Sequence, residues 1–491
     1  MRVCLLFDAP AWENRAARWA IETVAPLLDL AWRSAPPGTA AGEGEAVVFV
    51  GAPAGAPRDA AAVVAAGEWK PWDAAGLALA RFESVPMPCP GGTLAAPGDP
   101  RELPEAWLRA IGWMLAREEE RASSRRDQWE CFAGTFSRLH ELGVLELPLV
   151  NSYAAQLSRR IAAWCVRRGV RLEPAPRWKN GARFAAALTH DVDDVQMYSL
   201  RLAARLLRLA RGPRSYAFRK GVATALRSLA RLGRAGDPYW NFDRWVAEES
   251  RRGFRSGFYF FAPDPQPRHE YDAQYTMSDA LEFEGRRTTV AGLVRALAGR
   301  GFEIGLHGSY GSHLDASALA REKRQIEQVA GGPIAGVRQH FLRFEAARTW
   351  SAQQEAGFTC DSTLGYNEAI GFRAGIAAPF HPWDAGREGP MELLELPLTA
   401  MDGALFRAMK LDPAAAIVKA REHLDRVEAA GGLAVLLWHP NAADEQHFPG
   451  WWPCYIAALD HLVARGAWVA TPTEIAAWWR ERTARLAGGT A

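Results

Sequence analysis

The chain has 491 residues, of which 49% are hydrophobic and 23% charged, an ordinary globular composition that excludes disordered, collagen-like and coiled-coil classes. The 58 Lys and Arg residues nearly balance the 56 Asp and Glu residues, so no overall charge favours nucleic acid as a partner. At about 150 residues per domain, this length predicts two or three domains.

The cysteines and the apolar runs bear on where the protein resides. The six cysteines are scattered without a CxxC pair, which predicts reduced thiols rather than a disulfide framework. The apolar run before Asp8 is too short for the core of a signal peptide. No uncharged apolar stretch reaches the roughly 18 residues that a membrane span needs. We therefore expect a cytoplasmic protein.

The N-terminal part has the pattern of a small mixed α/β domain. Apolar runs predict buried strands at 3–7 and 46–52, and apolar positions at helical spacing predict helices within 104–142 and 153–168. A segment rich in Pro, Gly and charge at 172–183 predicts a domain boundary, so that an accessory domain occupies 1–175. No catalytic motif is visible in this domain.

From residue 183 onward, short apolar strands alternate with amphipathic helices. The alternation predicts a parallel sheet with helical crossovers and indicates a distorted (β/α) barrel of about seven strands over 183–486, with a doubly wound open sheet as the alternative. The expected strands are 184–191, 256–262, 302–308, 335–341, 359–364, 393–398, 433–440 and 467–472. The expected helices are 287–300, 315–330, 346–357, 413–430, 453–465 and 473–486.

One basic segment interrupts this alternation. Residues 195–236 contain nine Arg and one Lys but no acidic residue, and Arg201, Arg205 and Arg208 lie at helical spacing opposite leucines. Such a helix can lie on an anionic membrane surface, here the inner face, or carry an acidic partner. It can equally be a solvated face that acidic residues elsewhere balance, and both interpretations stay open.

Polar side chains gather at the ends of four predicted strands. They are Asp191 and Asp193 after the first strand, His307 after the third, Arg338 and His340 on the fourth, and His439 after a late strand. Because the carboxyl ends of parallel strands meet at one edge of a barrel, we expect these side chains to converge. Oxygen and nitrogen ligands without a thiolate suit a divalent ion such as zinc. A carboxylate base and a histidine acid beside it point to hydrolysis of an amide or ester.

Five segments, read in order, resemble the polysaccharide deacetylase family, the NodB-homology fold of carbohydrate esterase family four. They are LTHDVDD, EIGLHGSY, GVRQHFLRF, CDSTLGYNEAIGFRAG and LLWHP, and the resemblance covers residues 183–480. The part before them resembles the accessory domain of a divergent branch of that family. The resemblance implies a hydrolase that removes an N-acetyl group from a sugar of a surface polysaccharide or of its lipid-linked precursor.

The resemblance also implies catalytic roles for individual residues. Asp191 would take a proton from the attacking water, and Arg338 would orient it. His439 would act as the general acid that protonates the leaving sugar nitrogen, and Asp361 would tune that acid.

The implied cofactor is one divalent metal ion, expected to be zinc, with Asp193 and His307 among its ligands. The family's second histidine is missing, because Gly311 stands four residues after His307. Either His340, at a strand end, or His313, in a loop, can replace it. His340 is favoured, since a strand end fixes a ligand better than a loop does.

Several aromatic and basic residues near the motifs are candidates for contact with a sugar. They are Tyr310, Arg373, Trp438, Trp451 and Trp452. Arg373 can equally pair with an acidic residue, and Trp451 and Trp452 can instead pack a loop onto the barrel. The expected partner is an N-acetylated glycan or glycolipid, and nucleic acid is not expected. Two other functions stay open: hydrolysis of another non-peptide carbon–nitrogen bond in a small molecule, and glycan binding as a scaffold without catalysis.

Overall fold

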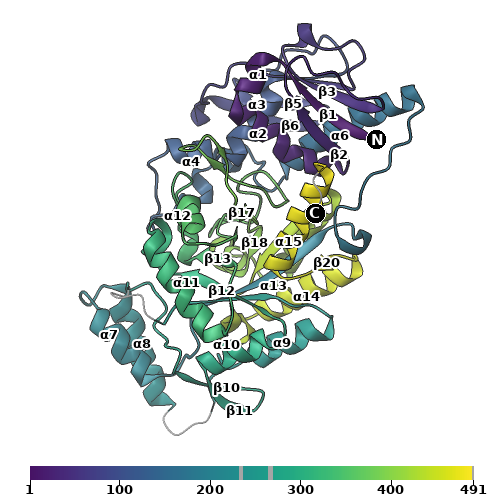
Figure 1. Ribbon diagram of the computed structural model, residues 1–491. Coiled ribbons are helices and arrows are strands. Elements are labelled where there is room, and N and C mark those ends of the chain that lie inside the picture. Colours follow the sequence, from purple (N-terminus) through teal and green to yellow (C-terminus); the bar gives the residue numbers. More distant parts are fainter. Residues whose placement is uncertain (232–235, 264–268, 489–491) are drawn as a thin grey trace.

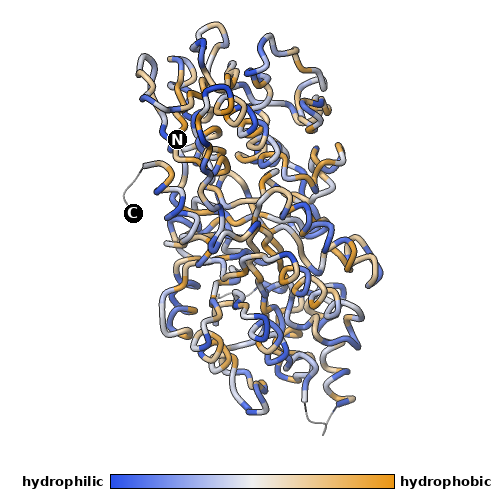
Figure 2. Tube along the Cα trace, turned by 90° about the vertical axis from the view of Figure 1, so that its right-hand side faces the viewer, coloured by the Kyte–Doolittle hydropathy of each residue, from blue (hydrophilic) through white to orange (hydrophobic). Residues whose placement is uncertain are grey.

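Two parallel sheets, one beyond the other along the long axis of the molecule, organise the chain (Figure 1). The computed structural model describes residues 1–231, 236–263 and 269–488. Residues 232–235, near the end of the basic segment, lie outside the described residues. Figure 2 shows the same elongated shape from the side. No helix within the described ranges is long and apolar enough to cross a bilayer.

The smaller sheet lies in the N-terminal part and confirms its predicted α/β character. Its five parallel strands run in the order β2 (Ala31–Ala35), β1 (Arg2–Phe7), β3 (Glu45–Gly51), β4 (Ala62–Ala65) and β7 (Glu102–Leu103). The longer helices beside it are α2 (Arg15–Val24), α3 (Glu105–Leu115) and α6 (Leu149–Arg168), and β5 (Leu77–Phe82) pairs with β6 (Val85–Pro90) as a hairpin. The strands predicted at 3–7 and 46–52 are therefore confirmed as β1 and β3.

The helical pattern predicted over 104–142 is broken after α3. Only the short helices α4 (Glu118–Ala122) and α5 (Arg138–Glu141) follow, and a non-α segment over 123–137 separates them. Arg117 has a φ of 53°, which takes the backbone out of the right-handed helix. The residues that follow have no apolar periodicity with which to pack a helix. The segment instead crosses to the second sheet.

The larger sheet curls into a distorted (β/α) barrel, as predicted. Its strands run in the order β17 (Leu394–Glu395), β14 (Cys360–Asp361), β13 (Gly336–Gln339), β12 (Glu303–Gly308), β9 (Gly257–Phe260), β8 (Ala185–Val192), β19 (Leu433–Leu437) and β18 (Ala400–Met401), and β20 (Trp468–Val469) also pairs with β8. All of these pairs are parallel. Every residue of β8 is buried, as expected for a strand that is covered on both faces.

Seven helices of the described chain cover the barrel, and six of them lie where the apolar spacing predicts; the first, over 242–251, was not predicted. They are α9 (Phe242–Arg251), α10 (Val290–Ala298), α11 (Ala316–Ala330), α12 (Thr349–Glu355), α13 (Pro413–Ala429), α14 (Trp451–Ala464) and α15 (Pro472–Leu486). The basic segment forms a pair of helices, α7 (Leu200–Leu209) and α8 (Tyr216–Ala230), at one end of the molecule (Figure 1). The six cysteines are buried free thiols, as expected. The domain division at 172–183 falls between the two sheets and stays a prediction.

Candidate active site

Four strand ends of the barrel converge on one pocket of about 660 Å³. β8 carries Asp191 near its end and is followed by Asp193, and β12 carries His307. β13 leads directly into His340, and His439 follows two residues after Leu437, the last residue of β19. All five side chains line the pocket. The structure thus brings together the residues that the strand pattern places at one edge of the barrel.

Three of these residues form the one group of possible metal ligands found within the described ranges. Asp193, His307 and His340 each offer an atom, and the atoms lie within 4.8 Å of one another. Oδ1 of Asp193 lies 3.3 Å from Nε2 of His307 and 3.7 Å from Nε2 of His340. This oxygen is buried yet makes no hydrogen bond, which is rare for a carboxylate. One carboxylate and two imidazoles fit a divalent ion that keeps a further position open.

The surroundings of these side chains keep their nitrogen and oxygen atoms available to a cation. Nδ1 of His307 donates to the carbonyl oxygen of Arg338 at 2.9 Å, which directs the lone pair of Nε2 toward Asp193. Burial lowers the pKa of His340 to about 3, so this imidazole is neutral, the form that binds metals. Burial raises the pKa of Asp193, but the neighbouring imidazoles outweigh it and hold the pKa below its usual value. His313, the alternative ligand, is buried in the turn Ser312–Leu314 and is not part of the group.

Asp191 lies beside the three possible ligands and is fixed by Arg338. Its Oδ2 is 3.7 Å from Nε2 of His307, and its Oδ1 accepts a hydrogen bond from Nη1 of Arg338 at 3.0 Å. The guanidinium is fully buried and also donates to Thr189 and to both the hydroxyl and the carbonyl oxygen of Ser362. Because its other donors bind Thr189 on β8 and Ser362 directly after β14, the guanidinium holds the Asp191 carboxylate in one orientation.

A carboxylate that the sequence analysis missed holds His439. Asp402, directly after β18, accepts hydrogen bonds from the backbone N–H and from Nδ1 of His439, both at 2.8 Å. Burial lowers the pKa of His439, but the charge and hydrogen bond of Asp402, together with the charges of Asp193 and Asp191, outweigh it and raise the pKa to about 9. Nε2 of His439 faces the group of ligands, 3.5 Å from Oδ2 of Asp193. A protonated imidazole with this orientation can donate a proton into the pocket.

Asp361, expected to tune the general acid, does not contact His439. Its carboxylate accepts hydrogen bonds from Gln353 and from the backbone and hydroxyl of Thr363. Burial raises its pKa, and its carboxylate lies next to that of Glu395. This expectation is corrected: the short strand β18 brings Asp402 next to β19, whose end is followed by His439. Asp361 lies on β14, which the strands β13, β12, β9 and β8 separate from β19 in the sheet.

The five residues expected to contact the sugar are buried and do not line the pocket, which corrects that expectation. Arg373 forms an ion pair with Glu120, to which it donates two hydrogen bonds of 2.8 and 2.7 Å. Tyr310 donates its hydroxyl to the carbonyl oxygen of Trp129. Trp438, Trp451 and Trp452 are at most 8% exposed. Aromatic side chains with this little exposure pack the loops onto the barrel.

The segment that breaks the N-terminal helix forms one wall of the pocket. Its lining residues are Asp127, Gln128, Trp129, Ala133, Thr135 and Phe136. The Trp129 ring stacks on Phe341, with centroids 4.5 Å apart and planes 12° apart. Phe341 and Leu342 have φ values of 56° and 52°, an unfavourable conformation for bulky residues that often marks a functional site. Cys131 and Asn367 both donate to the Phe341 carbonyl oxygen and hold this turn directly after His340.

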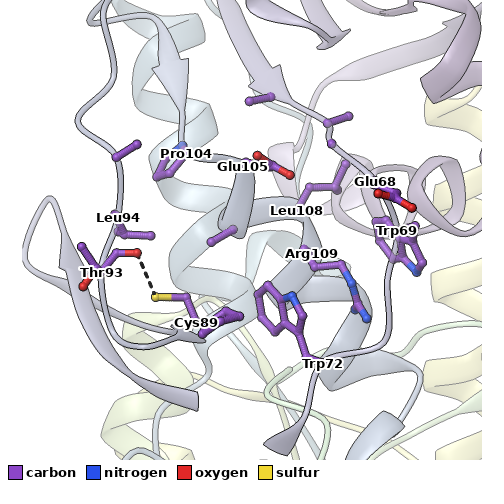
Figure 3. Close-up of a pocket in the computed structure, with 16 residues that line it drawn as sticks. Glu68, Trp69, Trp72, Cys89, Thr93, Leu94, Pro104, Glu105, Leu108 and Arg109 are labelled. Atoms are coloured by element: carbon purple, nitrogen blue, oxygen red, sulfur yellow. Dashed lines mark hydrogen bonds between the residues drawn. The ribbon is translucent and has the colours of Figure 1, made fainter. Parts of the chain in front are cut away.

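A second pocket, of about 320 Å³, lies in the N-terminal part at the end of β4 (Figure 3). Trp69 and Trp72 flank Arg109, whose guanidinium carbon is 4.9 and 5.1 Å from the two ring centroids. The guanidinium is already engaged with Glu118 and with the carbonyl oxygen of Lys70. This pocket therefore offers no free cation and none of the possible metal ligands described above.

Comparison with solved structures gives distant neighbours. No family model matches the chain, and no curated protein sequence matches it. A candidate polysaccharide deacetylase from Mycobacterium smegmatis is 22% identical over 62% of this chain and 93% of its own, with a TM-score of 0.41. A candidate polysaccharide deacetylase from Pseudomonas aeruginosa PAO1 is 17% identical over 63% and 95%, with a TM-score of 0.40. A CE4 family pseudoenzyme from Bacillus anthracis is 11% identical over 62% and 70%, with a TM-score of 0.27. Because the likeness is this low, the functional proposal rests on the residues of the site.

Proposed function

We propose that the chain is a metal-dependent hydrolase that removes the acetyl group from the nitrogen of an N-acetylated sugar. The observation that carries the proposal is the arrangement of Asp191 and His439 around the Asp193–His307–His340 group in a single pocket. A carboxylate base, an imidazole acid and an open cation site are together the parts needed for amide hydrolysis. The motif resemblance narrows the amide to an acetamido sugar.

Each residue has a separable task in this reaction. Asp193, His307 and His340 would hold a divalent ion, with zinc as the proposed metal, and this ion would supply Lewis acidity to water and to the acetyl carbonyl. Asp191, held by Arg338, accepts the proton of the attacking water. His439, held by Asp402, donates a proton to the sugar nitrogen as the carbon–nitrogen bond breaks. Acetate and a free amine are the products, and the wall that contains Trp129 offers an aromatic edge to the sugar.

The proposed substrate is a sugar of a surface polysaccharide or of its lipid-linked precursor. A pocket of about 660 Å³ is within the range of small-ligand sites and accommodates a terminal sugar of a longer chain. The test is acetate release from a panel of N-acetylated oligosaccharides, lipid-linked sugars and small cyclic amides. Release from cyclic amides alone would identify the alternative carbon–nitrogen hydrolase. A cytoplasmic location stays a prediction.

Two variants separate the roles of the adjacent aspartates. Asp191→Asn should retain one equivalent of metal and lose acetate release, because it removes a base and keeps the ligands. Asp193→Ala should lose both metal and activity. Full turnover by Asp191→Asn would refute the assignment of the base. A protein that holds no metal after purification with divalent ions, and that still binds glycan, would be the non-catalytic scaffold.

A further inference from the structure

The helices α7 and α8 pack against each other as a separate unit on the barrel. They approach closely at Gly221, where an added Cβ would lie 3.0–3.1 Å from atoms of Leu206 and Leu207. Leu202 and Leu206 of α7 are buried in the molecule. Apolar contact therefore holds the two helices to each other.

The cations that face the barrel are neutralised by its acidic residues. Nζ of Lys220 lies 2.9 and 3.0 Å from the two carboxylate oxygens of Asp194. Arg205 makes a bidentate pair with Asp279, at 2.5 and 2.9 Å. These two ion pairs neutralise the cations on the inner side of the helix pair. They also fix the pair next to Asp194, which follows the candidate ligand Asp193.

The outer side of the helix pair combines exposed leucines with unpaired cations. Half of the exposed large hydrophobic side chains of the described chain lie here, with exposed fractions of 47% for Leu200, 39% for Leu207, 64% for Leu226 and 56% for Leu229. Six arginines of the two helices and of the connection between them are also exposed and form no ion pair with the acidic residues that the structure describes: Arg201, Arg208, Arg211, Arg214, Arg219 and Arg227. A solvated face of a globular protein has no need of four exposed leucines.

We propose that this outer side of α7 and α8, termed the basic face, docks on an anionic lipid bilayer. The charges match, because the six arginines belong to a segment, 200–230, that contains no acidic residue, and they complement phosphate headgroups. The leucines distinguish a bilayer from a soluble polyanion, since only the bilayer offers an apolar layer beneath the charged one. Neither helix is apolar enough to span the bilayer, so the contact is with its surface.

Docking has a consequence for the active site. The Lys220–Asp194 pair ties the helix pair that carries the basic face to the segment that follows β8, so the docked protein would hold its pocket near the membrane surface. A lipid-linked sugar would be presented there. This consequence rests on the proposed function, whereas the docking itself does not.

Vesicle flotation tests the proposal without reference to catalysis. The full chain is mixed with vesicles of phosphatidylglycerol and phosphatidylcholine or with pure phosphatidylcholine, and the floated fraction is measured at low and high salt. Binding is expected to the mixed vesicles only and should decrease with salt, because salt screens the headgroup charge. Absence of binding to the mixed vesicles, or equal binding to both kinds, would overturn the proposal.

Paired variants separate the contributions of charge and of apolar contact. Arg219→Gln with Arg227→Gln should weaken binding roughly thirtyfold, since each cation near an anionic surface contributes about fivefold. Leu226→Ser with Leu229→Ser should weaken it at least about tenfold per leucine. The matched controls are Arg321→Gln with Arg324→Gln on α11 and Val418→Ser with Val463→Ser on α13 and α14, all at exposed positions, and they should bind normally.

The pattern of losses decides between a bilayer and a polyanion. If the arginine variants lose binding while the leucine variants keep it, the surface recognises a polyanion and the proposal is wrong. Acetate release from a soluble substrate should be unchanged in all four double variants, because none of the altered side chains lines the active-site pocket. Loss of vesicle binding with unchanged acetate release would therefore refute docking alone, and vesicle binding without acetate release would refute the proposed activity alone.

Discussion

The replacement Asp402→Asn tests the support of the general acid most sharply. Asp402 is fully buried, and its two oxygens accept hydrogen bonds from His439 at 2.8 Å each. The amide that replaces the carboxylate is nearly the same size, but it carries no charge and turns an NH₂ group toward one of the donors. Hydrogen bonds to a charged group are worth about 1.5–3 kcal/mol each. Loss of one to two of them corresponds to a decrease of about 10- to 10⁴-fold in the step that uses His439.

The assay compares kcat for acetate release with metal content, alone and in a double variant. Asp402→Asn should lower kcat by about 10- to 10⁴-fold and leave the metal content unchanged, because Asp402 is not one of the three possible ligands. In a His439→Ala background, Asp402→Asn should have no further effect on kcat, since Asp402 acts only through the imidazole. The assignment is refuted if the decrease in kcat of the double variant is the product of the decreases of the two single variants. It is also refuted if Asp402→Asn alone keeps kcat within a factor of about three of the unaltered protein.

Three further predictions concern stability and the pocket wall. Arg373→Met leaves Glu120 without one of its two buried guanidinium partners and should lower the free energy of unfolding by about 3–5 kcal/mol, measured in urea. Trp129→Ala should lower kcat/KM about tenfold with unchanged metal content, because it removes the stacked partner of Phe341 from the pocket wall. Burial raises the pKa of Glu322 to about 7, above its value in the unfolded chain, so its contribution to stability is present at low pH and is lost as the pH rises through 7. Glu322→Gln should therefore become more stable than the unaltered protein between about pH 5 and pH 8, by up to about 3 kcal/mol.

The barrel was predictable because its strands are buried on both faces. Continuous apolar runs such as the one that forms β8, each ending in a polar residue, have a periodicity and a termination that a single sequence displays. The meeting of Asp193, His307 and His340 follows from the same logic, since parallel strands present their carboxyl ends at one edge.

Other parts of the site depend on tertiary contacts that leave no local pattern. β18 has two residues, too few for a recognisable strand, so Asp402 could not be placed next to His439. The sequence contains a weak indication of this strand, because the largely apolar run before Asp402 ends at that residue and Gly403 follows it. Trp129 reaches the pocket from a segment with helical spacing at both of its ends, and only the structure shows that Arg117 interrupts the helix.

The misplaced sugar contacts have a physical explanation as well. Arg373 lies within a motif, which suggested contact with a ligand, but its partner Glu120 comes from the N-terminal part of the chain. Sequence spacing does not reveal which distant carboxylate neutralises a buried guanidinium. The tryptophans near His439 are buried for a similar reason, because their neighbours in the fold include aromatic residues from other elements.

The central claim is that strand ends of one barrel form a single cation site, and direct metal titration tests it most plainly. Metal-free protein is titrated with Co²⁺, and the visible absorption of the bound ion is followed together with equilibrium dialysis. The predicted result is saturation at one equivalent, with loss of the signal in Asp193→Ala and His340→Ala and its retention in His313→Ala. Saturable binding that survives the change at Asp193, or the absence of any bound equivalent, would contradict the account.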